Sequence, residues 1–126
     1  MTEEFIIFET AKLLKEKGFD WKCERTIDCN EIIRKYDYPQ SMSCCTEIND
    51  ELVEFLCPTL YVARKWLRET KKLHVEVSYM HGDYWIYDIL TIPNHDLVGL
   101  SDRPLVHYKS YEEALEVGIQ EALKLI

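Results

Sequence analysis

The clearest pattern of apolar and polar residues lies in residues 57–92, where helical spacing gives way to strict alternation. Thr59 is a plausible N-cap, and the apolar positions that follow recur at helical period, namely Leu60, Ala63, Trp66 and Leu67. From Leu73 to Tyr79 every second residue is apolar, which is typical of a half-buried strand. Gly82 suits a turn, and residues 84–92 are rich in aromatic and β-branched residues. The stretch therefore predicts one helix followed by a β-hairpin.

Two registers of this hairpin are possible, and they bury different aromatic rings. A two-residue turn would place Tyr79 opposite Ile86, whereas a three-residue turn would place Tyr79 opposite Trp85. Only the second register gives one continuous apolar face and leaves Asp88 on the other face with Glu76. We therefore predict the three-residue turn.

The two ends of the chain also show helical patterns. Residues 2–17 predict a helix that begins at Thr2 and ends at Gly18. Ser110 and Glu113 form a capping box that opens a final helix to about Leu125. Glycine lowers the stability of a helix relative to alanine. Close approach of this helix to another element would explain why Gly118 occurs in the middle of it.

The remaining segments carry weaker signals. Residues 19–26 look extended, residues 31–36 fit a strand or a short helix, and residues 38–43 look like a loop. Residues 48–56 suggest a short helix begun by Asn49 or Asp50. Two short apolar pieces follow, at residues 97–100 and 105–108, and the latter is a candidate third strand. The sum is an α+β fold, with two to three main helices packed on a small, mostly antiparallel sheet with a central β-hairpin.

Composition narrows the class of protein. The chain has 126 residues, 47% hydrophobic, which suits a single globular domain over residues 1–126. The net charge of −8 argues against nonspecific nucleic-acid binding, because phosphates are neutralised by Lys and Arg. No apolar run reaches the length of a membrane span, and the acidic residues 1–4 differ from the basic start of a signal peptide. We expect a cytoplasmic protein that does not bind membranes.

The sequence contains no recognisable metal-binding or catalytic motif. The sequence contains no C-x-x-C or H-x-x-x-H pair, the spacing that structural zinc sites commonly use. The nine possible zinc ligands are Cys23, Cys29, Cys44, Cys45, Cys57, His74, His81, His95 and His107. The sequence also has no phosphate loop, dinucleotide fingerprint or nucleophile elbow. We therefore expect reduced cysteines, no metal, no cofactor, no catalytic residue and no enzymatic activity.

Two groups of residues are candidates for binding. Aromatic rings crowd the end of the predicted hairpin, and exposed aromatics mark interfaces: Tyr79, Tyr84, Trp85 and Tyr87. The densest basic stretch of the chain adds Arg64 and Arg68. A third group, His74, Glu76 and Asp88, could share one face of the hairpin and is a candidate for acid–base chemistry by paired carboxylates. The ordinary alternative is the solvated outer face of an antiparallel sheet.

Several stretches resemble small uncharacterised proteins of bacterial phages and mobile elements. The similarity rests on residues 57–60, 65–69 (KWLRE) and 74–77 (HVEV), and on residues 108–116 and 118–123 near the end. Residues 13–19 match the opening of the same group. The resemblance implies an accessory phage or prophage product and carries over no catalytic residue.

These observations together favour a non-enzymatic module that binds a host or phage protein. Two alternatives stay open, a small-ligand protein that binds or sequesters a nucleotide and an acidic mimic of nucleic acid. A homodimer through the hairpin is a further expectation, because an open sheet edge and amphipathic rings favour two-fold contacts. Tyr108 or the segment before it could instead cover that edge within one chain.

Overall fold

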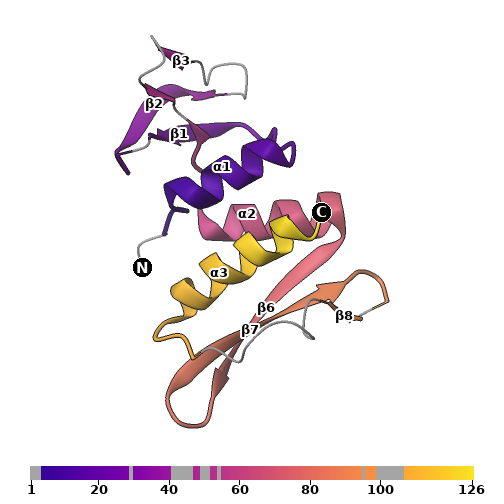
Figure 1. Ribbon diagram of the computed structural model, residues 1–126. Helices are drawn as coiled ribbons and strands as arrows, with labels where there is room; N and C mark the ends of the chain where they lie inside the picture. Colours follow the sequence, from indigo (N-terminus) through magenta and orange to yellow (C-terminus); the bar gives the residue numbers. More distant parts are fainter. Residues whose placement is uncertain are drawn as a thin grey trace. The chain divides into compact units, whose positions relative to one another are not determined.

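The computed structural model describes residues 4–28, 30–40, 47–48, 52–53, 55–94, 96–98 and 107–126. Contacts divide the chain into two compact units, Met1–Tyr61 and Val62–Ile126. Its helices and antiparallel sheets confirm the predicted α+β class (Figure 1). The single domain over residues 1–126 stays a prediction, because two compact units can still unfold together.

Among its described residues, the first unit contains the helix α1 (Phe8–Glu16) and the strands β1 (Cys23–Ile27), β2 (Ile33–Gln40), β3 (Glu47–Ile48), β4 (Leu52–Val53) and β5 (Phe55–Leu56). The second holds β6 (Leu73–Met80), β7 (Tyr84–Thr91), β8 (Leu97–Val98) and α3 (Tyr111–Lys124). The helix α2 (Leu60–Trp66) crosses the division and continues as a π-helical segment, η2 (Leu67–Lys71). No helix within the described ranges combines the length and the apolar character that crossing a membrane requires.

The hairpin of β6 and β7 has the predicted register. Tyr79 lies opposite Trp85, Val77 opposite Tyr87, and the turn consists of three residues between Met80 and Tyr84. Gly82 takes a φ of +106°, a conformation that glycine adopts without the steric cost other residues incur. The apolar face and the polar face of the hairpin are therefore those expected from the alternation.

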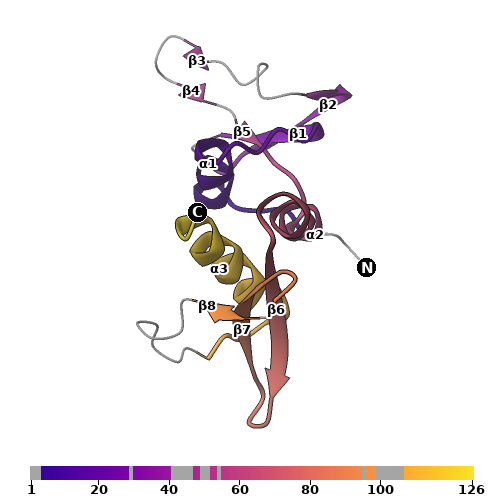
Figure 2. The same cartoon turned by 90° about the vertical axis from the view of Figure 1, so that its right-hand side faces the viewer.

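The helix α3 covers the apolar face of this hairpin (Figures 1 and 2). Glu113 N–H donates to Ser110 Oγ at 3.1 Å, which confirms the serine part of the predicted cap. A Cβ at Gly118 would lie 2.6 Å from Val75 Cγ1 and 3.1 Å from the Tyr87 ring. The expected close approach is confirmed, and it explains a glycine in the middle of a helix.

Helical spacing in the sequence predicts that the buried stripe of α3 consists of Tyr111, Ala114, Leu115, Gly118, Ile119, Ala122 and Leu125. This prediction is wrong at its last position. Leu125 is exposed, and Leu123 is buried instead. The helix ends at Lys124, so Leu125 follows the last turn and is not held against the hairpin. The other apolar stripe, in residues 60–67, is fully buried as predicted, and this includes Trp66.

The small sheet of the first unit has β1 at its centre, between β2 and β5 (Figure 2). The helix α1 packs against β5, with the rings of Phe8 and Phe55 5.3 Å apart. The Lys15 ammonium lies 5.0 Å from the centre of the Phe55 ring. Cation–π attraction adds to the burial of this ring.

The predicted start of the first helix is wrong. The helix begins at Phe8, and Thr2 lies outside the described residues. The segment before it is extended, because Leu60 N–H donates to Glu4 C=O at 2.9 Å and Ile6 N–H donates to Pro58 C=O at 3.2 Å. The predicted end is confirmed, since Gly18 takes a φ of +91° directly after the last turn.

The middle of the chain forms strands. Residues 31–36 fitted a strand or a short helix, and the structure places most of them in the strand β2. The same strand includes residues 38–40, so the loop predicted over residues 38–43 is wrong at these three positions. The helix predicted over residues 48–56 is wrong as well, and Asn49 and Asp50 lie outside the described residues. Phe55 and Leu56 instead pair with Ile27 and Thr26 of β1. This partner is distant in sequence, and long-range pairing overrides a weak local helix pattern.

Candidate functional site

The turn of the hairpin carries the least buried of the predicted aromatic residues. We define the hairpin tip as Tyr79, Tyr84 and Trp85 together with the turn that joins β6 and β7. Tyr79 is 57% exposed, yet its ring lies edge-on to Trp85, with 5.0 Å between centroids. Tyr79 Oη also donates to Asp83 Oδ1 at 2.8 Å. The ring is therefore exposed and held in one orientation.

The same contact changes the ionisation of Tyr79. The hydrogen bond to the Asp83 carboxylate raises the pKa of the Tyr79 hydroxyl, and partial desolvation and the negative charge add to it. The hydroxyl thus stays protonated and keeps its role as a donor. Asp83 takes a φ of +64° in the turn, a conformation that Asp tolerates better than most residues.

Trp85 connects the tip to the rest of the second unit. Its ring lies edge-on to Tyr111 at the start of α3, with centroids 5.6 Å apart. Its backbone exchanges two hydrogen bonds with Tyr108, at 2.9 and 3.0 Å. Tyr108 therefore borders β7 only as an isolated bridge, and the third strand of this sheet is β8. Leu105 and Val106 of the expected strand lie outside the described residues.

The other two aromatic candidates lie in different surroundings. Tyr84 stacks on His107 with 3.7 Å between ring centroids, on the face of β7 opposite to that of Trp85. Tyr87 is only 4% exposed and lies beside Gly118 under α3, so it is a core residue. The candidate surface therefore consists of Tyr79, Tyr84 and Trp85, and Tyr87 is not part of it.

The two arginine candidates differ in their connection to the tip. Arg64 Nη1 donates to Tyr111 Oη at 3.0 Å, and Tyr111 in turn contacts Trp85. Arg68 lies in η2, and no hydrogen bond or ion pair within the described residues links it to the tip. Tyr111 is the link that sequence reasoning missed, because its part in the stripe of α3 gave no sign of a second partner.

The third candidate group is assembled as expected. Glu76 lies directly opposite Asp88 in the hairpin, and His74 Nε2 is 2.8 Å from Glu76 Oε2. The Glu76 side chain is about half exposed. Such a charged outer face is ordinary for an antiparallel sheet whose other face is covered.

The described cysteines are structural in character. Cys23 and Cys57 are buried thiols that are not part of a disulfide, and their Sγ atoms lie 3.5 and 3.6 Å from backbone carbonyls. In the ranges that the structure describes, no three His, Cys, Asp or Glu side chains are grouped to hold a metal ion. Four of the nine possible ligands lie outside those ranges, so the metal-free state stays a prediction: Cys29, Cys44, Cys45 and His95.

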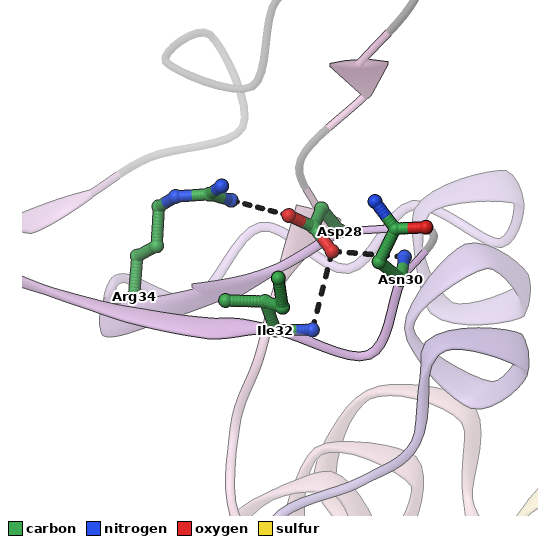
Figure 3. Close-up of polar contacts among 4 residues, drawn as sticks. All are labelled: Asp28, Asn30, Ile32 and Arg34. Atoms are coloured by element: carbon green, nitrogen blue, oxygen red, sulfur yellow. Dashed lines mark hydrogen bonds and ion pairs between the residues drawn. The ribbon is translucent and has the colours of Figure 1, made fainter.

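Sequence reasoning also missed a buried carboxylate between β1 and β2. Asp28 is fully buried, and its Oδ2 receives a hydrogen bond from Arg34 Nη1 at 2.6 Å (Figure 3). Its Oδ1 accepts the N–H groups of Asn30 and Ile32, at 2.9 and 3.1 Å. The spacing Asp28-x-Asn30 is a turn signal, since Asp commonly bonds the N–H two residues later.

These contacts decide the ionisation of Asp28. Desolvation by burial raises the pKa of the carboxyl, but the hydrogen bonds from Arg34, Ile32 and Asn30 lower it. The net pKa lies below the ordinary value, because the hydrogen bonds and the Arg34 charge together outweigh the desolvation. The carboxylate therefore joins the strands β1 and β2 through a charged, fully hydrogen-bonded turn.

We predict that Asp28→Asn lowers the melting temperature at neutral pH by roughly 5 °C or more. A lowered pKa stabilises the fold above the pKa of the unfolded chain, about 3.9, and this contribution is lost as the pH falls through the folded value. The gap between the wild type and Asp28→Asn should therefore begin to narrow below about pH 4 and should close only below the folded pKa of Asp28. Exposed Asp20 gives the matched control, Asp20→Asn, and an equal gap at pH 3 and pH 7 would contradict this role of Asp28.

Comparisons with known proteins add no relative. No protein-family model, no curated protein and no solved structure matches the chain.

Proposed function

We propose that the protein is a non-enzymatic protein-interaction module, an accessory product of a phage or prophage that binds a host or phage protein through the hairpin tip. The phage origin is supported by the resemblance of residues 65–69, 74–77 and 108–116. Action in the cytoplasm is supported by an odd number of cysteines without a pairing motif.

One observation carries the proposal: the Tyr79 ring is exposed, yet its orientation is fixed. A ring that is already held by Trp85 and Asp83 loses little conformational freedom on binding. Tyrosine also offers a partner an apolar face and a polar hydroxyl in the same contact. In both views of the ribbon the turn that joins β6 and β7 extends beyond the N-terminal end of α3, so the hairpin tip is a projecting element (Figures 1 and 2).

Affinity capture from host lysate tests this proposal. The wild-type chain should capture a specific protein, and Tyr79→Ala should weaken that binding about tenfold or more, as expected for a central aromatic contact. Tyr61→Ala is the matched control, because Tyr61 is also 57% exposed but lies on α2. Equal loss of binding in both variants, or no specific partner, would contradict the proposal.

A small anionic ligand such as a nucleotide is a second candidate, favoured by Arg64. Its Nε atom is buried and has no hydrogen-bond partner among the described residues. A ligand at 100-fold its Kd would add about 2.7 kcal/mol to the stability of the fold. A thermal-shift screen in which nucleotides stabilise the wild type but not Arg64→Gln would favour this candidate over the interaction module.

A further inference from the structure

The sheet of the second unit has one edge that no described strand covers. Its strand order is β6-β7-β8, and β7 is bordered on its far side by β8 and by Tyr108. The alternative in which Tyr108 covers the sheet edge thus applies to β7 and not to β6. Along Leu73–Met80, the described residues form no backbone pairing other than that with β7.

The hydrogen bonds show which groups of β6 point outward. Ile92 N–H donates to Lys72 C=O at 3.0 Å, so Lys72 faces β7. In an antiparallel pair the facing residues alternate, so the even-numbered residues of β6 bond to β7. The N–H and C=O groups of Leu73, Val75, Val77 and Tyr79 therefore point away from it.

The outer edge of β6 lacks three features that commonly prevent strand addition, namely proline, lysine and a β-bulge. The strand contains no Pro and no Lys, and all eight residues pair with β7 in an unbroken register without a bulge. Unpaired N–H and C=O groups on a regular edge form a template for another strand.

We propose that β6 pairs antiparallel with β6 of a second copy of this chain, with the two-fold axis at Val75. Outward groups can pair only with outward groups, so Val75 would lie opposite the second copy's Val75, and Leu73 opposite its Val77. This register gives a continuous sheet across the two copies, with both α3 helices on the same face.

Charge selects this register. With the axis at Val75, His74 lies opposite the second copy's Glu76, and the reverse contact repeats on the other side of the axis. His74 and Glu76 already bond within one chain at 2.8 Å, so their chemistry is complementary. An axis at Glu76 would instead place Glu76 opposite the second copy's Glu76, and like charges directly opposed are destabilising. An axis at Val77 would place His74 opposite Met80 and Glu76 opposite Ser78, so it would form no charge pair.

This dimer is independent of the proposed foreign partner. Pairing of residues 73–77 leaves the turn of each hairpin outside the contact between the copies. A dimer would thus present two hairpin tips. Variants of His74 report on the dimer, and variants of Tyr79 report on the foreign partner, so the two proposals can fail separately.

Sedimentation and backbone amide exchange of the full chain test the contact. We expect a species of twice the 15.0 kDa chain mass at micromolar concentration in physiological salt. The amides of Val75 and Val77 should exchange slowly at high concentration and quickly on dilution, whereas those of His74 and Glu76 stay slow at both. A 15.0 kDa species up to about 100 µM, or a dimer with fast exchange at Val75 and Val77, would overturn the proposal.

Charge variants test the register. His74→Glu should weaken dimerisation about tenfold, which corresponds to about 1.4 kcal/mol, because each contact occurs twice. His74→Lys should strengthen it. Lys109→Ala is the matched control, since it makes the same change in net charge as His74→Glu at an exposed residue outside β6. Equal weakening by Lys109→Ala and His74→Glu would overturn the assigned register.

Discussion

Replacing Trp66 by alanine is expected to lower the free energy of unfolding by about 3–5 kcal/mol. Trp66 is only 1% exposed and is the largest of the fully buried side chains. Its removal loses the transfer free energy of the indole and leaves a cavity at a fully buried position. A fall in melting temperature of roughly 10–20 °C, followed by circular dichroism, is the expected result.

A control in the same helix separates burial from helix propensity. Tyr61→Ala makes a comparable aromatic deletion at an exposed position of α2 and should change the melting temperature little. Trp66→Phe, which keeps part of the buried ring, should fall between the wild type and Trp66→Ala. An unchanged melting temperature in Trp66→Ala would show that the helix is not anchored by this side chain.

Gly118→Ala is expected to lower the free energy of unfolding by about 1–3 kcal/mol, although alanine is the better helix former. The added Cβ would lie 2.6 Å from Val75 Cγ1, a distance at which one of the two elements must move. Both neighbours are stiff, because Val75 is β-branched and Tyr87 is buried against α3. Equilibrium denaturation in urea gives the measurement.

A double-mutant cycle with Val75 identifies the cause. In a Val75→Ala background the methyl group nearest to the added Cβ is gone, so Gly118→Ala should cost clearly less than in the wild type. Equal costs in both backgrounds would show that the close approach of α3 to β6 is not what requires glycine.

The hairpin could be predicted in detail because its information is local. Alternation from Leu73 to Tyr79, a glycine in the turn and the charged Asp88 together left one register that buries the apolar side chains on a single face. The cap at Ser110 could also be predicted, because a capping box depends only on residues within one turn of the helix. The close approach at Gly118 could be predicted because a glycine in the middle of a helix is otherwise unfavourable.

The first unit could not be predicted in the same way, because its elements are fixed by distant partners. Glu4 and Ile6 are extended because they bond to Leu60 and Pro58, more than fifty residues later. The start of α1 depends on Glu31, whose carboxylate accepts Phe8 N–H at 3.2 and 3.3 Å. No local pattern contains such pairings, so a helix from residue 2 was the natural reading.

The candidate site was partly predictable. The cluster of rings followed from the register, but alternation alone did not show that Tyr87 would lie beneath α3 while Tyr79 stays exposed. The role of Tyr111, which contacts both Trp85 and Arg64, depends on how α3 packs on the hairpin. The sequence alone does not show how a helix packs on a hairpin, so the contacts of Tyr111 could not be predicted from it.

Photo-crosslinking in the host is the most direct test of the hairpin tip as a contact surface for another protein. A benzophenone amino acid would be placed at position 79 or, as a control, at position 61, which has the same exposure. The account predicts a specific adduct from position 79, identified by mass spectrometry as this chain joined to a foreign protein, and none from position 61. Identical adducts from both positions, or adducts of two copies alone, would contradict it.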